Sequence, residues 1–226
     1  MKGRTWYEAD PTLYAQIVRE VKAVYRNLYF STQDDIVYLK GSFPISDGER
    51  VIDRYQIEVE FPLDFPDSLP IVRELGGRIP RNADRHIFKQ DDALCLFVAD
   101  EASWVCPDRS DFLGFLDGPV RNFLISQTVF DLTGKWPFGQ RSHGAKGLFE
   151  FYAEKLAASD VQVVLKLMDL MRKKEIKGHW PCPCGSGKRL RDCHYRIVRE
   201  FRQKTQPIHI DRSYRMIADW ILAKGR

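Results

Sequence analysis

The prediction of the fold class starts from residues 54–75, RYQIEVEFPLDFPDSLPIVREL. Its first part alternates apolar and polar side chains, a pattern that predicts a strand with one buried and one solvated face. The apolar positions are Tyr55, Ile57, Val59 and Phe61. A proline-rich turn and a second extended run, PIVREL, follow directly. Turn residues between short extended runs favour an antiparallel meander.

The flanking sequence adds a third strand and several helices. An extended run starts at Ile36, and an amphipathic helix is predicted over 11–25, with Asp10 as its N-cap and Pro11 at its first position. Residues 76–104 show no periodicity, which is typical of a long, irregular and often functional segment. Helical patterns follow, and they cover 108–132 with an interruption at Gly118 and Pro119, 147–158, 160–174, 192–204 and 211–224. This order predicts an α+β fold.

The composition argues against a disordered or membrane-spanning chain. A hydrophobic content of 44% and a charged content of 29% are those of a soluble globular protein. No run approaches 18 uncharged apolar residues, and the first residues, MKGRTWYEADPTLY, lack the apolar centre of a signal peptide. We therefore expect a cytoplasmic protein without a membrane partner.

Charge is distributed unevenly along the chain. Residues 172–226 contain 15 Lys and Arg against 5 Asp and Glu, whereas the preceding residues carry a net charge of −6. We predict two modules, a domain over 1–174 and a basic module over 175–226, divided near the segment RKKEIK that starts at Arg172. Few aromatic side chains lie among the basic ones, so we expect solvated helices that suit an acidic partner, and we regard nucleic-acid binding as the weaker interpretation.

Three of the five cysteines fall in one short segment, CPCGSGKRLRDCH, residues 182–194. An odd number of cysteines without a secretion signal argues against a disulfide framework and favours metal binding. Three thiolates and one imidazole are donors that tetrahedral zinc prefers, and four protein ligands close its coordination shell, so a structural Zn²⁺ site is predicted. The alternative is a group of reduced cysteines without a metal. The predicted ligands are Cys182, Cys184, Cys193 and His194.

This segment closely resembles the SEC-C motif, a small zinc-binding element found at the C-terminus of the SecA translocation motor and at the ends of many bacterial proteins. The resemblance implies zinc at the same four residues and a docking or stabilising role for the module. It implies no part in catalysis.

Residues 10–132 resemble the ubiquitin-conjugating enzyme fold, and more closely the bacterial ubiquitin-conjugating-like enzymes found in antiphage and ubiquitin-like conjugation operons. Cys95, in DDALCLF, stands where that family has its nucleophile, and WPFGQRSHGAKGLFEFYAE, residues 136–154, looks like an extension seen among the bacterial proteins. The other positions that match the family's Phe-Pro, Tyr-Pro and Trp-x-x-Pro patterns are Phe61, Pro62, Asp64, Phe65, Pro66, Pro70, Trp104 and Pro107.

The resemblance implies acyl transfer through a thioester. Cys95 would receive the C-terminal acyl group of a ubiquitin-like modifier, or of a cyclic-oligonucleotide synthase, from an adenylating activating enzyme and pass it to a protein acceptor. A thiolate suits this role because it is a good nucleophile and its thioester stays reactive toward amines. The transfer itself needs no metal or organic cofactor.

One departure from the family concerns the His-Pro-Asn tripeptide, which is replaced here by DRHIF around His86. The absent Asn places transfer to lysine in doubt more than thioester formation. We predict that His86 acts as a hydrogen-bond donor or base, with capping of the loop as the alternative, and that Asp100 orients the acceptor amine. Cys106 and His143 are weaker candidates, the first for a nucleophile and the second for a donor that closes over the site.

The sequence is also compatible with two other functions. The first is a catalytically idle ubiquitin-conjugating-like protein that binds its partners without forming a thioester. The second is a cysteine hydrolase that pairs Cys95 with His86 or His143, which no peptidase or nucleophile-elbow signature supports.

Overall fold

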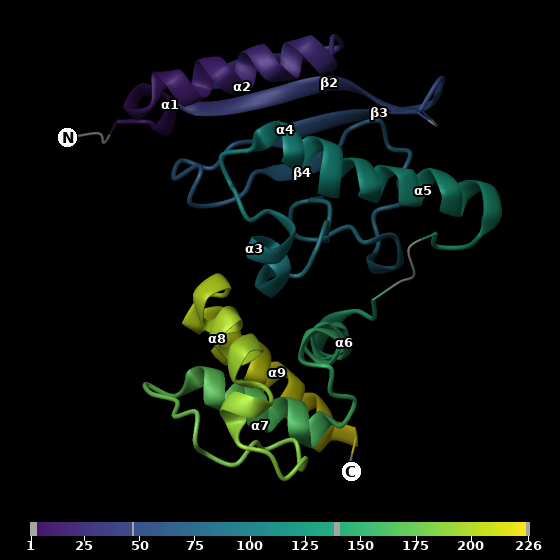
Figure 1. The fold of residues 1–226 in the computed structure, drawn as a ribbon. Helices are drawn as coiled ribbons and strands as arrows, with labels where there is room; N and C mark the ends of the chain where they lie inside the picture. Colours follow the sequence, from purple (N-terminus) through teal and green to yellow (C-terminus); the bar gives the residue numbers. More distant parts are fainter. Residues whose placement is uncertain (1–3, 47, 138–140, 225–226) are drawn as a thin grey trace. The chain divides into compact units, whose positions relative to one another are not determined.

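The computed structural model describes residues 4–46, 48–137 and 141–224, and the chain forms two compact units (Figure 1). The first unit comprises Met1–Phe97 and Val105–Gly139, and the second comprises Val98–Trp104 and Gln140–Arg226. The chain therefore leaves the first unit, contributes a short segment to the second, and returns.

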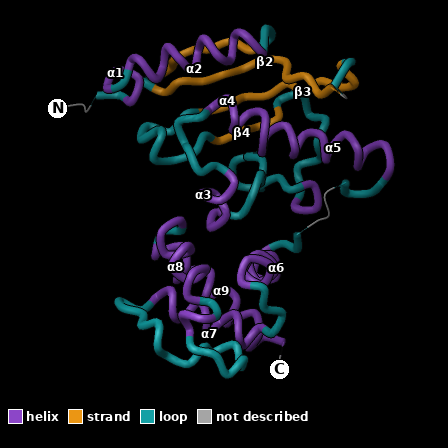
Figure 2. The backbone as a smooth tube through the Cα atoms, viewed as in Figure 1, coloured by secondary structure: helices purple, strands orange, loops and turns teal. Residues whose placement is uncertain are grey.

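A four-stranded antiparallel sheet in the order β1-β2-β3-β4 organises the first unit (Figure 2). The apolar side chains of β3 predicted to face inward, Tyr55, Ile57 and Val59, are fully buried. The opposite face is ionic: Lys40 pairs with Glu58 at 2.7 Å across β2 and β3. The strands are β1 (Leu28–Gln33), β2 (Ile36–Ser46), β3 (Val51–Glu60) and β4 (Ile71–Glu74).

Helices cover the apolar face of this sheet. Helix α2 (Pro11–Val24) begins as predicted, because the Asp10 side chain accepts a hydrogen bond from the Leu13 N–H and Pro11 occupies the first position. It buries Ile17 and Val21 in the core shared with the sheet. The other elements are α1 (Trp6–Ala9), the 3₁₀ turn η1 (Ala83–Arg85), α4 (Phe112–Phe115), the π-helical turn η3 (Leu116–Val120) and α5 (Arg121–Thr133).

The predicted interruption of the helical region 108–132 is confirmed by the π-helical turn, which contains Pro119. Strand β1 was not predicted. It lies at the edge of the sheet, and only Leu28 among its residues is buried, so its sequence carries no clear alternation. The α+β class is confirmed by the sheet and its covering helices, and a Cys/His cluster lies in the C-terminal region.

The second unit is helical and has its own core. Its largest fully buried aromatic side chains are Phe151, Tyr152 and Phe201. Tyr152 and Phe201 stack at 5.0 Å between ring centroids, which joins two of the helices. The elements are α6 (Gly144–Leu156), α7 (Val161–Arg172), α8 (Tyr195–Lys204), α9 (Pro207–Lys224) and the 3₁₀ turns η2 (Ala99–Glu101) and η4 (Leu190–Asp192), while α3 (Ala102–Val105) runs across the division between the units.

These units divide the chain at different residues from the predicted boundary between 174 and 175. Helices α6 and α7 were assigned to the first domain, but they share one core with the basic helices α8 and α9. The charged segment that starts at Arg172 is therefore a connection inside the second unit.

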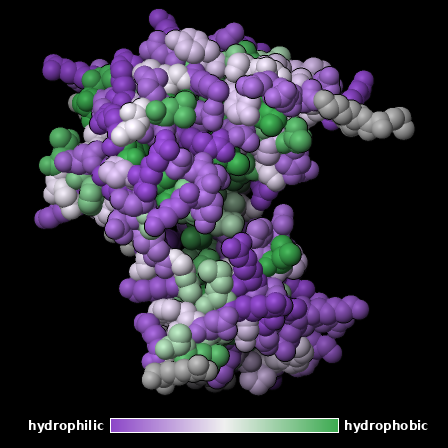
Figure 3. Space-filling view, turned by 180° about the vertical axis from the view of Figure 1, so that it is seen from behind, coloured by the Kyte–Doolittle hydropathy of each residue, from purple (hydrophilic) through white to green (hydrophobic). Residues whose placement is uncertain are grey.

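The described residues contain no helix with the length and apolar run needed to cross a membrane. In the space-filling view of Figure 3, hydrophilic residues cover most of the face shown, and hydrophobic residues lie among them in small groups.

Candidate functional site

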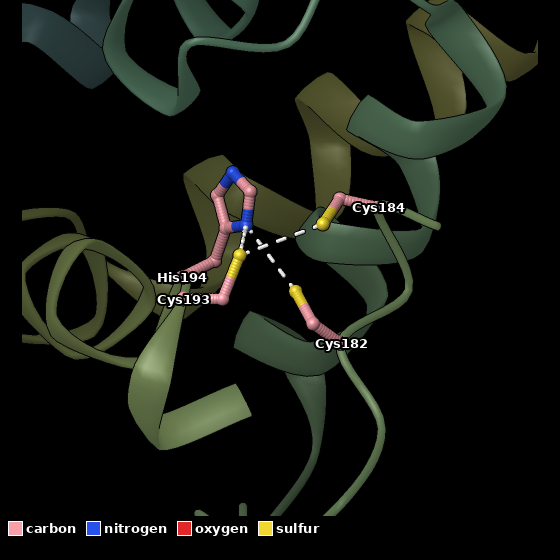
Figure 4. Close-up of side chains that lie close together, drawn as sticks. All are labelled: Cys182, Cys184, Cys193 and His194. Atoms are coloured by element: carbon pink, nitrogen blue, oxygen red, sulfur yellow. Dashed lines mark hydrogen bonds between the residues drawn. The ribbon is translucent and has the colours of Figure 1, made fainter. Parts of the chain in front are cut away.

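Four potential metal ligands converge in the second unit (Figure 4). The ligand atoms of Cys182, Cys184, Cys193 and His194 all lie within 4.8 Å of one another. His194 Nδ1 is 3.2 Å from the Cys182 sulfur and 3.1 Å from the Cys193 sulfur, and the sulfurs of Cys184 and Cys193 are 3.5 Å apart. This juxtaposition makes the predicted four residues a single candidate site.

The backbone between the ligands folds into a tight loop that brings the two pairs together. The Cys182 N–H donates to the Lys188 carbonyl at 2.9 Å, and the Leu190 N–H donates to the Trp180 carbonyl at 2.7 Å. Gly185 and Gly187 have φ of +79° and +72°, a conformation that favours glycine, so the loop can reverse direction within a few residues. Leu190 is fully buried and anchors the loop in the helical core.

The remaining ring nitrogen of His194 is held by helix α6. Nε2 lies 3.0 Å from the carbonyl oxygen of Leu156, the last residue of that helix. A carbonyl oxygen only accepts, so Nε2 must carry the proton and Nδ1 is left with its lone pair directed at the sulfurs. Such a hydrogen bond is typical of metal-binding histidines, whose second nitrogen is oriented by a backbone or carboxylate group.

Ser186 adds a hydroxyl to the sulfur cluster. Its Oγ lies 3.2 Å from the Cys184 sulfur and 3.6 Å from the Cys193 sulfur. Burial opposes ionisation of Cys184, but hydrogen bonds with Ser186 and with the thiols of Cys182 and Cys193 outweigh it and lower the pKa of this thiol to about 6. In contrast, burial raises the pKa of Cys182 to about 11.

The comparisons with known proteins find a family match in the same segment. Residues 181–196 match the SEC-C motif. The match covers all four converging residues. No curated protein and no solved structure matches the chain.

The donor set of the SEC-C segment fits a zinc ion. Ligand distances of about 2.3 Å to sulfur and about 2.0 Å to nitrogen place tetrahedral donors about 3.5 to 3.8 Å apart. The separations observed between donor atoms, from 3.1 Å upward within a span of 4.8 Å, are close to that size. Four protein ligands leave no open position, and the bound ion would supply a structural cross-link between the two ends of the loop.

Cys95 lies in the first unit, at the end of a small hairpin that starts at His86. The Cys95 N–H donates to the His86 carbonyl at 2.8 Å, and Ile87 and Leu94 form an antiparallel bridge inside this pair. The thiol is half-buried, and burial raises its pKa above the ordinary value for cysteine. The structure therefore brings together the backbones of Cys95 and His86 within one ordered turn.

Two residues that the sequence did not indicate hold the start of this hairpin. Arg85 and Gln127 are both buried, and Arg85 Nε donates to Gln127 Oε1 at 2.7 Å. They are separated by 42 positions, so no local pattern links them. The one indication of this contact in the sequence is Gln127 itself, a polar residue at an inward-facing position of its helix.

Asp100 belongs to the second unit, whereas Cys95 and His86 belong to the first. Its carboxylate is buried and accepts a hydrogen bond from the Tyr152 hydroxyl at 2.7 Å, and its carbonyl accepts one from Thr205. Burial and the nearby carboxylate raise the pKa of Tyr152. The Asp100 side chain is therefore bonded inside the helical core, and its role toward an acceptor amine stays a prediction.

The two weaker candidates have structural positions. Cys106 is buried in the core of the first unit, and burial raises its pKa to about 11, which disfavours a nucleophile. His143 is the N-cap residue of α6 and makes no side-chain capping hydrogen bond there.

Proposed function

We propose that the first unit is a ubiquitin-conjugating-like acyltransferase and that Cys95 accepts the C-terminal acyl group of a ubiquitin-like protein or cyclic-oligonucleotide synthase as a thioester. The observation that carries the proposal is the half-buried Cys95 thiol at the end of an ordered hairpin. The order of elements supports it, because an N-terminal helix, an antiparallel meander, the cysteine segment and a further helix follow one another as the resemblance implies.

In the proposed step the Cys95 sulfur attacks the carbonyl carbon that the activating enzyme presents. A carbon–sulfur bond forms, the bond to the activating enzyme's leaving group breaks, and the thiol proton is transferred to that group or to solvent. An acceptor amine then attacks the same carbon, a carbon–nitrogen bond forms and the carbon–sulfur bond breaks, and the proton that the amine loses passes to the departing Cys95 thiolate or to solvent. Because burial raises the pKa of this thiol, a smaller fraction of it is ionised near neutral pH than for an exposed cysteine, so the attack needs a group that takes its proton.

His86 is proposed to assist the transfer. Its carbonyl accepts a hydrogen bond from the Cys95 N–H, and its ring and that of Trp136 lie nearly perpendicular, with their centroids 5.3 Å apart. In this proposal the imidazole serves as a hydrogen-bond donor or base for the reacting groups.

The SEC-C segment is proposed to bind Zn²⁺ as a structural ion. The support is the convergence of three sulfurs and one correctly oriented imidazole, together with the motif match. The ion takes no part in the transfer chemistry.

Intact-protein mass spectrometry tests the proposed function. The protein is mixed with ATP and with the adenylating enzyme and the ubiquitin-like protein or synthase encoded beside it. We expect a mass increase that thiol reagents remove, which is absent in Cys95→Ala and retained in the matched control Cys106→Ala. A complex that survives gel filtration without any adduct would instead support the idle binding protein.

A further inference from the structure

Arg85 is a buried charge in the first unit, with only 9% of its surface exposed. Nε donates to Gln127, Nη2 donates to Asp131 Oδ1 at 2.7 Å, and the guanidinium lies 4.9 Å from the centre of the Phe130 ring. The ion pair with Asp131 is only partly buried, because the Asp131 side chain is 36% exposed, and such a pair contributes little to stability. The value of this arrangement therefore lies in the geometry that it imposes.

Gln127 holds both the side chain and the main chain of Arg85. Its amide is fully buried, Oε1 accepts from Arg85 Nε at 2.7 Å, and Nε2 donates to the Arg85 carbonyl at 2.9 Å. Turning the amide by 180° would set donor against donor and acceptor against acceptor, so one orientation alone satisfies both bonds. The backbone of residue 85 is thereby fixed relative to helix α5.

The connection continues from Arg85 to the thiol-bearing residue. His86 follows directly, with φ of +55°, and its N–H donates to the Ala83 carbonyl at 2.9 Å. Its own carbonyl accepts from the Cys95 N–H at 2.8 Å. The backbone position of Cys95 therefore depends in part on the bonds that hold residues 85 and 86, while the Leu94 N–H holds the other side of the hairpin by donating to the Val72 carbonyl at 2.8 Å.

Aromatic contacts provide a second connection to the same place. Phe130, beneath the Arg85 guanidinium, stacks with Trp136 at 4.5 Å, and Trp136 meets the His86 ring edge-on. Gln127, Phe130 and Asp131 follow the i, i+3, i+4 spacing that places side chains on one helix face. One face of α5 thus holds both residues that start the hairpin.

We infer that the Arg85–Gln127 pair positions Cys95, by holding the start of the 86–95 hairpin so that the sulfur meets the incoming carbonyl carbon in a constant geometry. The inference rests on the proposed thioester function. Misplacement of a reacting group by about 1 Å can cost about 100-fold in rate, so loss of this pair should slow transfer even in a folded protein.

The variant Gln127→Met tests the inference, because methionine has a similar length and removes both hydrogen bonds to Arg85. The matched control is Thr128→Val on the same helix. Thr128 Oγ1 contacts the Tyr55 hydroxyl at 2.9 Å and donates to Asp53 at 2.8 Å, so this change also removes buried hydrogen bonds but leaves residue 85 untouched.

The first measurement is alkylation of Cys95 by iodoacetamide as a function of pH, followed by mass spectrometry of the Cys95 peptide. In Gln127→Met we expect alkylation at pH 7.5 to be about tenfold faster and its midpoint to fall toward the ordinary thiol pKa of about 8.5. Cys106 reports unfolding of the unit and should stay protected. Thr128→Val should remain within about twofold of the parent protein.

The second measurement is thioester formation in the mixture with ATP, activating enzyme and modifier. We expect Gln127→Met to lower the saturating rate about tenfold or more while Thr128→Val, at a matched loss of Tm, lowers it less than twofold. Gln127→Glu keeps an acceptor for Arg85 and should recover part of the rate.

Equal effects of Gln127→Met and Thr128→Val on both measurements, or unchanged alkylation in Gln127→Met, would overturn the inference. If alkylation separates the two variants but the parent protein forms no thioester, the positioning of Cys95 stands and the proposed function fails.

Discussion

Removal of the proposed Zn²⁺ ion by a chelator is expected to loosen helices α6 and α7 as well as the loop that carries its proposed ligands. Two of the contacts between that loop and the helical core are the fully buried side chain of Leu190 and the hydrogen bond from His194 to the Leu156 carbonyl at the end of α6. Both depend on a loop with little apolar content of its own, so both should weaken when the ion leaves.

The size of the effect follows from these two contacts. Full burial of a leucine contributes about 1.5 to 3 kcal/mol, and one hydrogen bond contributes about 0.5 to 1.5 kcal/mol. Their combined loss, about 2 to 4.5 kcal/mol, raises the opening equilibrium of the helical core about 30- to 2,000-fold, because 1.4 kcal/mol is a factor of ten.

Hydrogen exchange with mass spectrometry measures this directly, with and without a chelator and after zinc is restored. Peptides from α6 and α7 should exchange faster by the factor above, while peptides from β3 in the other unit serve as the internal control. His194→Cys is the matched variant: it keeps four ligands but removes the bond to Leu156, so it should show only the smaller part of the effect. If the chelator leaves hydrogen exchange in α6 and α7 unchanged while the amides of residues 178–194 lose their protection, the expected coupling between the loop and these helices is contradicted.

Three further predictions concern single residues. Cys95→Ser should trap an oxyester that resists thiol reagents in the conjugation mixture, and the absence of an adduct with either residue would count against the proposed thioester. Burial raises the pKa of Cys106 to about 11, whereas an unfolded thiol ionises near about 8.5, so ionisation favours the unfolded chain and thermal stability should decline between these pH values. Melting curves of Cys106→Ala should show a shallower decline, and an equally steep one would show that other groups cause it. Gly147→Ala should lower the Tm although alanine favours helices, because a Cβ there would lie 1.8 Å from the Ser142 carbonyl oxygen, while Gly118→Ala meets open space and should be neutral or stabilising by up to about 1 kcal/mol.

Features of the fold set by short-range patterns could be predicted from the sequence. Asp10 and Pro11 identify the start of α2, and the alternation through Tyr55 and Val59 identifies β3, because each pattern comes directly from capping or pleat geometry. Strand β1 could not be predicted in this way. Its pairing with β2 supplies the hydrogen bonds, and most of its side chains face solvent.

The candidate sites also include features that short-range patterns predict and contacts that form only in the folded chain. The four metal ligands lie within 13 consecutive residues, so their spacing alone indicates the cluster. Arg85 and Gln127, or Asp100 and Tyr152, meet only after the chain has folded across 42 or 52 positions. A buried polar residue with a distant partner looks the same in sequence as a solvated one, which is why the bond between Asp100 and Tyr152 could not be predicted.

Residues 98–104 belong to the second unit, although the residues on both sides of this segment belong to the first. A protease that cuts only between residues 137 and 141 separates the polypeptide into two pieces, yet the first piece keeps residues 98–104, which belong to the second unit and of which Val98 and Trp104 pack against its core. The Trp104 ring, 5.1 Å from Phe201, and the Asp100 carboxylate on Tyr152 would retain them there. Cloning either unit as one continuous stretch therefore divides a core, whereas co-expression of the two fragments should reassemble it.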